Sequence, residues 1–251
     1  MIINSPLEQF CINSLIYFEF CTIALSFTNS SLFMLISCSL MYFIYNISIY
    51  QATIIPNNWQ SGIEFLYGFV ANTLIQSIAD KKEATKYFPF IFFLFSFILF
   101  NNLVGMIPYS FCITSHLCIT FTLGLIIWFG TTIIGFRTHG LHFFSLFMPS
   151  GAPFGIMPFL IGIELLSFIF KGISISVRLF ANMMAGHSLL KILAGFAWIM
   201  LSAGTLGIFG AGITLSIVII ISGLEFGIAF LQAYVFIMLS CMYLNDCIAL
   251  H

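Results

Sequence analysis

The sequence consists largely of apolar runs that are too long for the elements of a soluble domain. The stretch 30–50, for example, holds no charged residue and is long enough to cross a bilayer as one helix. Hydrophobic residues make up 61% of the 251 residues and charged residues only 6%, so the charges cannot cover a water-soluble body of this size. The runs lack strand-like alternation, which favours helices over a barrel. We therefore predict an all-α integral membrane protein and exclude soluble enzymes, nucleic-acid binders and disordered chains.

Polar breaks between the apolar runs divide the chain, 1–251, into segments of a single membrane domain. An amino-terminal segment at 1–29 is followed by ordinary spans predicted at 30–50, 87–107 and 116–136. Between the first two spans, 59–79 has apolar residues at helical spacing with polar residues between them, which predicts an amphipathic surface helix.

Two apolar segments near the end of the chain, 155–193 and 203–245, are longer than an ordinary span. The first would measure about 57 Å as a helix, whereas crossing a hydrocarbon core of about 30 Å at about 40° takes about 39 Å. Each segment must therefore be broken or strongly tilted. We expect a hairpin of two long, strongly tilted membrane helices.

Basic residues place two loops on the same side of the membrane. The loop before the second span carries Lys81, Lys82 and Lys86, and Arg137 follows the third span. Two crossings separate these positions, so the positive-inside rule assigns both loops to the cytoplasm or the matrix.

Polar side chains inside the two long segments form a stripe on each predicted helix. The stripe in the first segment consists of Glu164, Lys171, Arg178 and Asn182, with His187 further along. The stripe in the second segment consists of Glu225, Gln232 and Tyr243. A charge at mid-membrane costs about 2.5–3.5 kcal/mol, so these residues must face a partner or water.

Such a stripe has two interpretations. Carboxylates and a histidine along a helix can pass protons, whereas arginine keeps its proton and acts as a fixed positive charge. The alternative is a structural ladder of ion pairs that joins the two helices, for example Arg178 with Glu225. We favour the first, because ionisable residues within a membrane usually mark an ion path.

The sequence gives no sign of a cofactor, a metal site or a catalytic residue. It lacks the glycine-rich motifs that bind nucleotides, and its seven cysteines are scattered without a CxxC pair. The net charge of −1 gives no field that would attract nucleic acid.

The segment from Arg178 to His187, Arg-Leu-Phe-Ala-Asn-Met-Met-Ala-Gly-His, resembles the RLxAN–AGH motif of subunit a (subunit 6) of F-type ATP synthases, in its mitochondrial form. Four other segments resemble the same family in the same order along the chain: 5–10, 101–109, 139–144 and 225–236. The resemblance therefore extends over residues 5–245.

This resemblance implies a non-catalytic, proton-translocating stator subunit of the membrane (Fo) sector. Arg178 matches the essential arginine that faces the carboxylates of the rotating c-ring. His187 and Glu225 match the half-channel open to the intermembrane space, and Glu164 matches the half-channel on the matrix side. Asn182 and Gln232 match polar residues near the arginine. At Lys171 the family usually has a second arginine, and lysine lacks the planar fork that allows bidentate contacts.

The resemblance also implies partners and a location. The partners are the c-subunit ring, other stator and peripheral-stalk membrane subunits of ATP synthase, and lipid, and the location is the mitochondrial inner membrane with several crossings.

Two other functions stay open. A transporter or proton-pumping subunit of another respiratory complex would show broken helices in paired halves and charges in several spans, whereas here the charges cluster in the last two segments. A purely structural anchor would tolerate loss of the whole stripe. The sequence also leaves open whether His116, His139 and His142 are solvated or functional.

Overall fold

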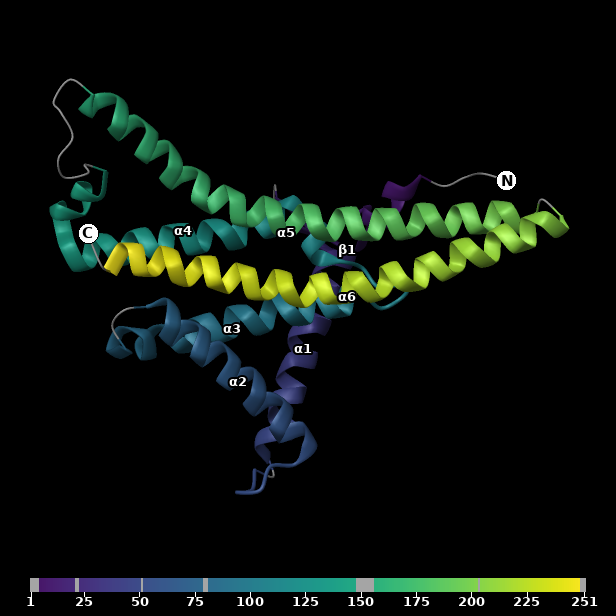
Figure 1. Ribbon diagram of the computed structural model, residues 1–251, viewed down its shortest axis with the longest axis horizontal. Coiled ribbons are helices and arrows are strands. Elements are labelled where there is room, and N and C mark those ends of the chain that lie inside the picture. The colour runs from purple at the N-terminus through teal and green to yellow at the C-terminus, as the bar shows by residue number, and fades with distance from the viewer. Residues whose placement is uncertain are drawn as a thin grey trace. The chain divides into compact units, whose positions relative to one another are not determined.

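Helices make up most of the computed structural model, which describes residues 5–20, 23–50, 52–78, 81–147, 156–202 and 204–248 (Figure 1). The α-helices are α1 (Asn29–Tyr50), α2 (Asn58–Ser77), α3 (Lys81–Gly105), α4 (Leu117–His139), α5 (Met157–Leu201) and α6 (Thr205–Ile248). Short 3₁₀ helices lie at η1 (Pro6–Phe10), η2 (Ile113–Ser115) and η3 (Gly140–Phe147).

Five helical stretches among the described residues are long and apolar enough to cross a membrane. They are Asn29–Tyr50, Lys82–Gly105, Leu117–Phe144, Met157–Leu201 and Gly207–Ile248. Their length and composition agree with the predicted multi-pass membrane protein, because only a fully hydrogen-bonded backbone is stable in lipid.

The two long helices are continuous. α5 has 45 residues and α6 has 44, so the break that the sequence left open is not found in either helix. α5 runs to Leu201 rather than to residue 193, because residues 194–201 hold neither a proline nor a charge that would end it. Gly204 follows α5 with φ +89°, a conformation that glycine adopts without strain, and α6 begins at the next residue.

The amino-terminal segment contains a two-stranded antiparallel sheet that the apolar runs did not indicate. Strand β1 (Ser14–Phe20) pairs with β2 (Ile23–Thr28), from Ser14 opposite Thr28 to Phe20 opposite Ile23. Both strands are rich in aromatic and branched residues, which favour extended backbone. The hairpin is an addition to the helical fold class that we predicted.

The chain packs as two compact units, each built from several stretches of the sequence. The first unit consists of Met1–Phe43, Phe97–His116 and Leu179–Ala233. The second consists of Ile44–Ser96, Leu117–Arg178 and Tyr234–His251. Each unit has its own apolar cluster: Cys112, Met183 and Ala229 in the first, and Phe143, Phe147 and Cys247 in the second.

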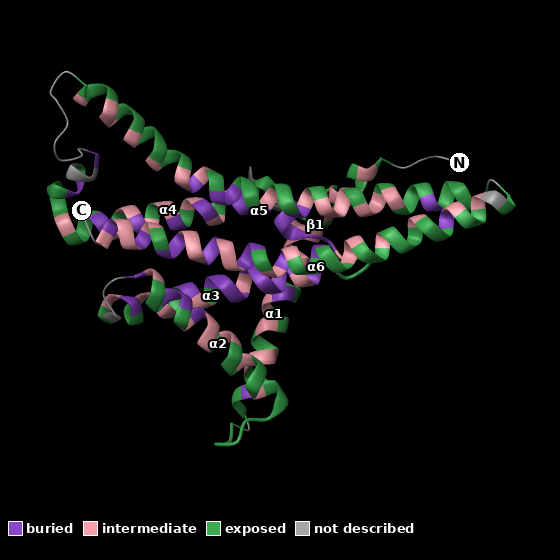
Figure 2. Ribbon diagram, in the orientation of Figure 1, coloured by how far each residue is buried: buried purple, intermediate pink, exposed green. Residues whose placement is uncertain are grey.

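The helices differ in how far they are buried, as Figure 2 shows. Within an apolar stretch of 18 residues taken from each helix, 61% of the stretch is buried in α3, against 17% in α5 and 11% in α6. α3 is therefore a core helix, while α5 and α6 leave most of their apolar surface for lipid or for another protein.

Candidate functional site

His187 of α5 and Glu225 of α6 meet inside the first unit. The two helices lie side by side there (Figure 1). His187 Nδ1 lies 3.5 Å from Glu225 Oε1, and their side chains are only 14% and 3% exposed. Gly186 makes this approach possible, because a Cβ at that position would lie 2.5 Å from Glu225 Oε1. The carboxylate thus packs directly against the backbone of α5.

This pair keeps unused hydrogen-bonding capacity although it is buried. Both carboxylate oxygens of Glu225 and the Nε2 of His187 are shielded from solvent and make no hydrogen bond with any residue in the described ranges. Buried polar atoms in proteins are almost always hydrogen-bonded, to water where no protein group is available. The arrangement is suited to exchanging protons with water.

A second polar contact joins the same two helices. Asn182 Nδ2 donates a hydrogen bond of 2.8 Å to Gln232 Oε1, and the Gln232 side chain is buried. Asn182 pairs with Gln232 and His187 pairs with Glu225, so residue numbers fall on α6 as they rise on α5. This order is that of an antiparallel hairpin.

Arg178 lies on α5, four residues before Asn182. Its side chain is exposed, and it makes no ion pair or hydrogen bond with another residue that the structure describes. The carboxylate of Glu225 lies against His187. The guanidinium is available to a group outside this chain.

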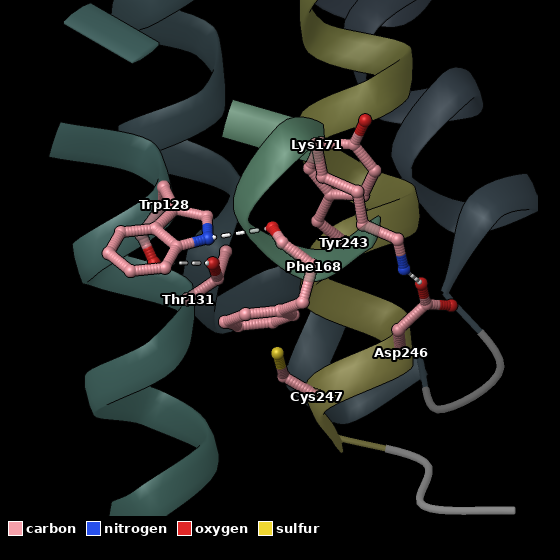
Figure 3. Close-up of a pocket in the computed structure, with 7 residues that line it drawn as sticks. All are labelled: Trp128, Thr131, Phe168, Lys171, Tyr243, Asp246 and Cys247. Carbon is pink, nitrogen blue, oxygen red and sulfur yellow. Dashed lines mark hydrogen bonds and ion pairs between the residues drawn. The ribbon is translucent and has the colours of Figure 1, made fainter. Parts of the chain in front are cut away.

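A group of charged and aromatic side chains lies in the second unit, and Figure 3 shows it. Lys171 Nζ of α5 forms an ion pair of 3.0 Å with Asp246 Oδ2 of α6 and lies 5.4 Å from the centre of the Tyr243 ring. Trp128 of α4 donates a hydrogen bond of 2.9 Å to the carbonyl of Phe168. These residues line a cavity of about 10 Å³ together with Thr131 and Cys247, which is close to the smallest space that holds one water molecule.

The remaining candidate residues lie outside these groups. Glu164 is on α5, partly buried, and belongs to neither group of contacts. His139 Nε2 is 2.9 Å from the carbonyl oxygen of Ile248, and the His116 ring stacks on Phe111 with the ring centres 5.0 Å apart. His142 is exposed.

The sequence candidates did not include Asp246, Asn102 or Cys112, although Asp246 pairs with Lys171 and the other two residues contact α6. Asp246 follows Tyr243 by three residues, and continuing the stripe along α6 would have included it. Asn102 is fully buried and donates a hydrogen bond of 3.2 Å to the carbonyl of Ala229, while its Oδ1 lacks a hydrogen bond from the described residues. An amide in the middle of an apolar run was the available signal. Cys112 carries no such signal, because small apolar cysteines are common in helices and turns.

Comparisons with known proteins identify relatives along the whole chain. The family model described as ATP synthase A chain matches residues 31–245. The ATP synthase subunit a of Marchantia polymorpha is 50% identical over 249 residues, which cover 98% of this chain and 99% of that protein. The subunit a of Chondrus crispus is 50% identical over 250 residues, covering 100% and 98%. The subunit a of Rhodospirillum rubrum is 46% identical over 248 residues, covering 99% and 100%.

Proposed function

The chain belongs to the family of ATP synthase A chains, and from this premise we propose that it is the proton-translocating stator subunit of the membrane sector of an ATP synthase. The observation that carries the proposal is that Arg178, which has no ion pair among the described residues, lies on the same helix as His187 of the buried His187–Glu225 pair. A fixed positive charge on α5 and a proton-exchanging pair that joins α5 to α6 are what proton-driven rotation needs.

Arg178 has the electrostatic role. A carboxylic acid on a c-subunit arrives from lipid in its neutral form, because desolvation disfavours the charged form. The guanidinium of Arg178 favours the ionised form, so the acid releases its proton. Arg178 cannot take up that proton itself, and it therefore separates the entry path from the exit path.

The pair His187 and Glu225 reprotonates the c-subunit carboxylate from the intermembrane side. Both side chains can change their protonation state, and their unused hydrogen-bonding atoms can exchange protons with water. The Asn182–Gln232 contact lies between this pair and Arg178 along the helices and keeps polar groups facing each other.

Glu164 and the Lys171–Asp246–Tyr243 group form the exit on the matrix side. The end of α6 contacts the end of α4 through His139 and the carbonyl of Ile248. Arg137 lies in the last turn of α4, and the positive-inside rule assigns that end to the matrix. Asp246 is therefore near the matrix surface.

The c-ring covers the exposed faces of α5 and α6, and the remaining lipid-facing surface is shared with other stator and peripheral-stalk subunits. α5 would be about 67 Å long when straight, so it must be strongly tilted to stay within the membrane. The protein lies in the mitochondrial inner membrane and takes no part in the chemistry of ATP formation.

Replacing Arg178 tests the proposal. In vesicles that hold the assembled complex, Arg178→Ala should abolish proton-driven ATP synthesis while native electrophoresis shows the complex intact. Arg178→Lys, which keeps a charge, serves as the matched variant. Synthesis at a near-normal rate in Arg178→Ala contradicts the proposal, and so does a purified protein that carries no ring of small two-helix proteolipids.

A further inference from the structure

An apolar groove lies between α3, α4 and α6 within the second unit, and its volume is about 210 Å³. The buried side chains of Ile91 and Ile127 line it on the protein side. Phe90 and Ile126, which are 45% and 50% exposed, line its outer edge. The groove therefore opens towards whatever surrounds these helices, which is lipid where they cross a membrane.

The hydroxyl groups that line the groove already have hydrogen-bond partners within their own helices. Thr131 Oγ1 donates a hydrogen bond of 3.0 Å to the carbonyl of Trp128. Ser240 Oγ donates one of 2.7 Å to the carbonyl of Phe236. Gly130 adds no side chain, and a Cβ at this position would meet no atom of the described residues within 4 Å. An apolar chain can therefore lie beside Gly130 without burying an unpaired polar group.

Two basic side chains lie at one end of this groove. Tyr87 lines the groove, and Lys86 Nζ lies 5.5 Å from the centre of the Tyr87 ring. On α4, Arg137 follows Gly130 by seven residues, so it lies within about 20° of Gly130 around the helix. Arg137 is exposed and forms no ion pair with another described residue. Lys86 lies 3.4 Å from Glu83, but its side chain is 65% exposed, so this ion pair is weak and leaves the ammonium group accessible.

The basic end of the groove lies at the membrane surface. Lys86 is in the second turn of α3 and Arg137 is in the last turn of α4, so the positive-inside rule assigns both to the matrix side. Tyrosine is frequent at the level of lipid headgroups, where Tyr87 would then lie. Ile126 lies about 16 Å from Arg137 along α4, well inside the hydrocarbon. The groove thus passes from basic groups through an aromatic ring to an apolar wall, which is the order of headgroup, interface and acyl chain in a phospholipid.

We propose that this groove binds a phospholipid with an anionic headgroup, with an acyl chain between α3 and α4 and the phosphate beside Lys86 and Arg137. Basic pockets between transmembrane helices on the matrix side suit anionic headgroups. The charges favour a lipid over a helix of another subunit, because such a helix would need acidic residues of its own at the level of the two cations. The proposal does not depend on the proton path, since lipid binding is measured without proton flow.

Photolabelling of the assembled complex tests the proposal. Phosphatidylglycerol and phosphatidylcholine probes, each with a diazirine in one acyl chain, are added in equal amounts to phosphatidylcholine vesicles that hold the complex. After illumination, mass spectrometry locates the label. The phosphatidylglycerol probe should label peptides that contain 87–91 and 126–134 at least about fivefold more than the phosphatidylcholine probe, which is roughly the contribution of one basic residue near the surface. Equal labelling by the two probes overturns the proposal, and so does the absence of label because a helix of another subunit covers the groove.

Matched variants separate the two parts of the site. Gly130→Leu fills the groove and should reduce labelling by both probes to background, whereas Gly68→Leu on α2, where the new Cβ also has no atom within 4 Å, should label normally. Lys86→Gln with Arg137→Gln should remove only the preference for phosphatidylglycerol, and Lys191→Gln on α5 should keep it. Normal labelling of Gly130→Leu, or a preference that survives without both cations, contradicts the site. Should the variants fail to assemble, the comparison of the two probes on the unaltered complex still decides.

Discussion

The imidazole of His187 and the carboxylate of Glu225 lie against each other in the interior of the first unit, with Nδ1 and Oε1 3.5 Å apart. The two residues come from different helices and are 38 positions apart by their numbers (225 − 187 = 38). Neither side chain fills its hydrogen-bonding capacity within the described part of the chain.

Replacing both residues of this pair with leucine should slow passive proton conductance through the membrane sector. Apolar side chains can neither bind a proton nor order water, so the entry path is lost while the helices still pack. Because the two residues are in contact, the single changes should not add up to the double change. Conductance is measured in vesicles with an imposed membrane potential, and His142→Gln, in an exposed position, is the control. Normal conductance in the double variant contradicts the role of the pair.

Gly186→Ala should disturb proton uptake without preventing assembly. The new methyl group would lie 2.5 Å from Glu225 Oε1, and the flexible carboxylate must move away from the backbone of α5. The matched control is Gly195→Ala on the same helix, where no atom lies within 4 Å of the new Cβ. An alanine in an open helical position stabilises by about 0.5–1 kcal/mol. ATP synthesis should therefore fall in the first variant only, and equal rates would refute the steric argument.

Removing one partner of the Lys171–Asp246 pair should cost more than removing both. Lys171→Met leaves Asp246 without its cation near the membrane, whereas Lys171→Met with Asp246→Asn leaves no unpaired charge. The double variant should regain part of the thermal stability that the single variant loses, with a coupling of about 0.5–3 kcal/mol. The midpoint of thermal inactivation of the assembled complex measures this. Strictly additive losses would show that the pair is not coupled.

Thiol alkylation should distinguish Cys112 from Cys11. Burial raises the pKa of the Cys112 thiol, so at pH 8 a smaller fraction is thiolate, the form that reacts. Iodoacetamide should therefore label Cys112 much more slowly than the exposed Cys11, and the labelling rate of Cys112 should keep rising above pH 8.5. Mass spectrometry of the labelled peptides gives both rates in one sample. Equal rates at pH 8 contradict the burial of Cys112.

The membrane class and the long helices were predictable from the sequence because they depend on local properties. A long, predominantly apolar run must form a helix in lipid whatever it packs against, and this rule covers α1 as well as α5. The seven-residue spacing of Glu225 and Gln232 likewise places both on one face of α6, and the structure turns that face towards α5 through His187 and Asn182.

The long-range contacts of the polar side chains were not predictable, since they join positions that are distant in sequence. Asp246 meets Lys171 across 75 positions and Asn102 meets the carbonyl of Ala229 across 127. The hairpin of β1 and β2 depends on pairing between two short strands that carry no membrane signal. From the sequence alone, Gly186 is only a residue of low helix propensity. The need for glycine at this position follows from its contact with Glu225, which only the structure shows.

The two polar contacts between α5 and α6 also have a mechanical consequence. Asn182–Gln232 and His187–Glu225 join α5 to α6 at two different positions along the helices. Sliding one helix past the other by a single turn would undo both at once. A load applied to either helix by a turning neighbour is therefore borne by the two together, without shear between them.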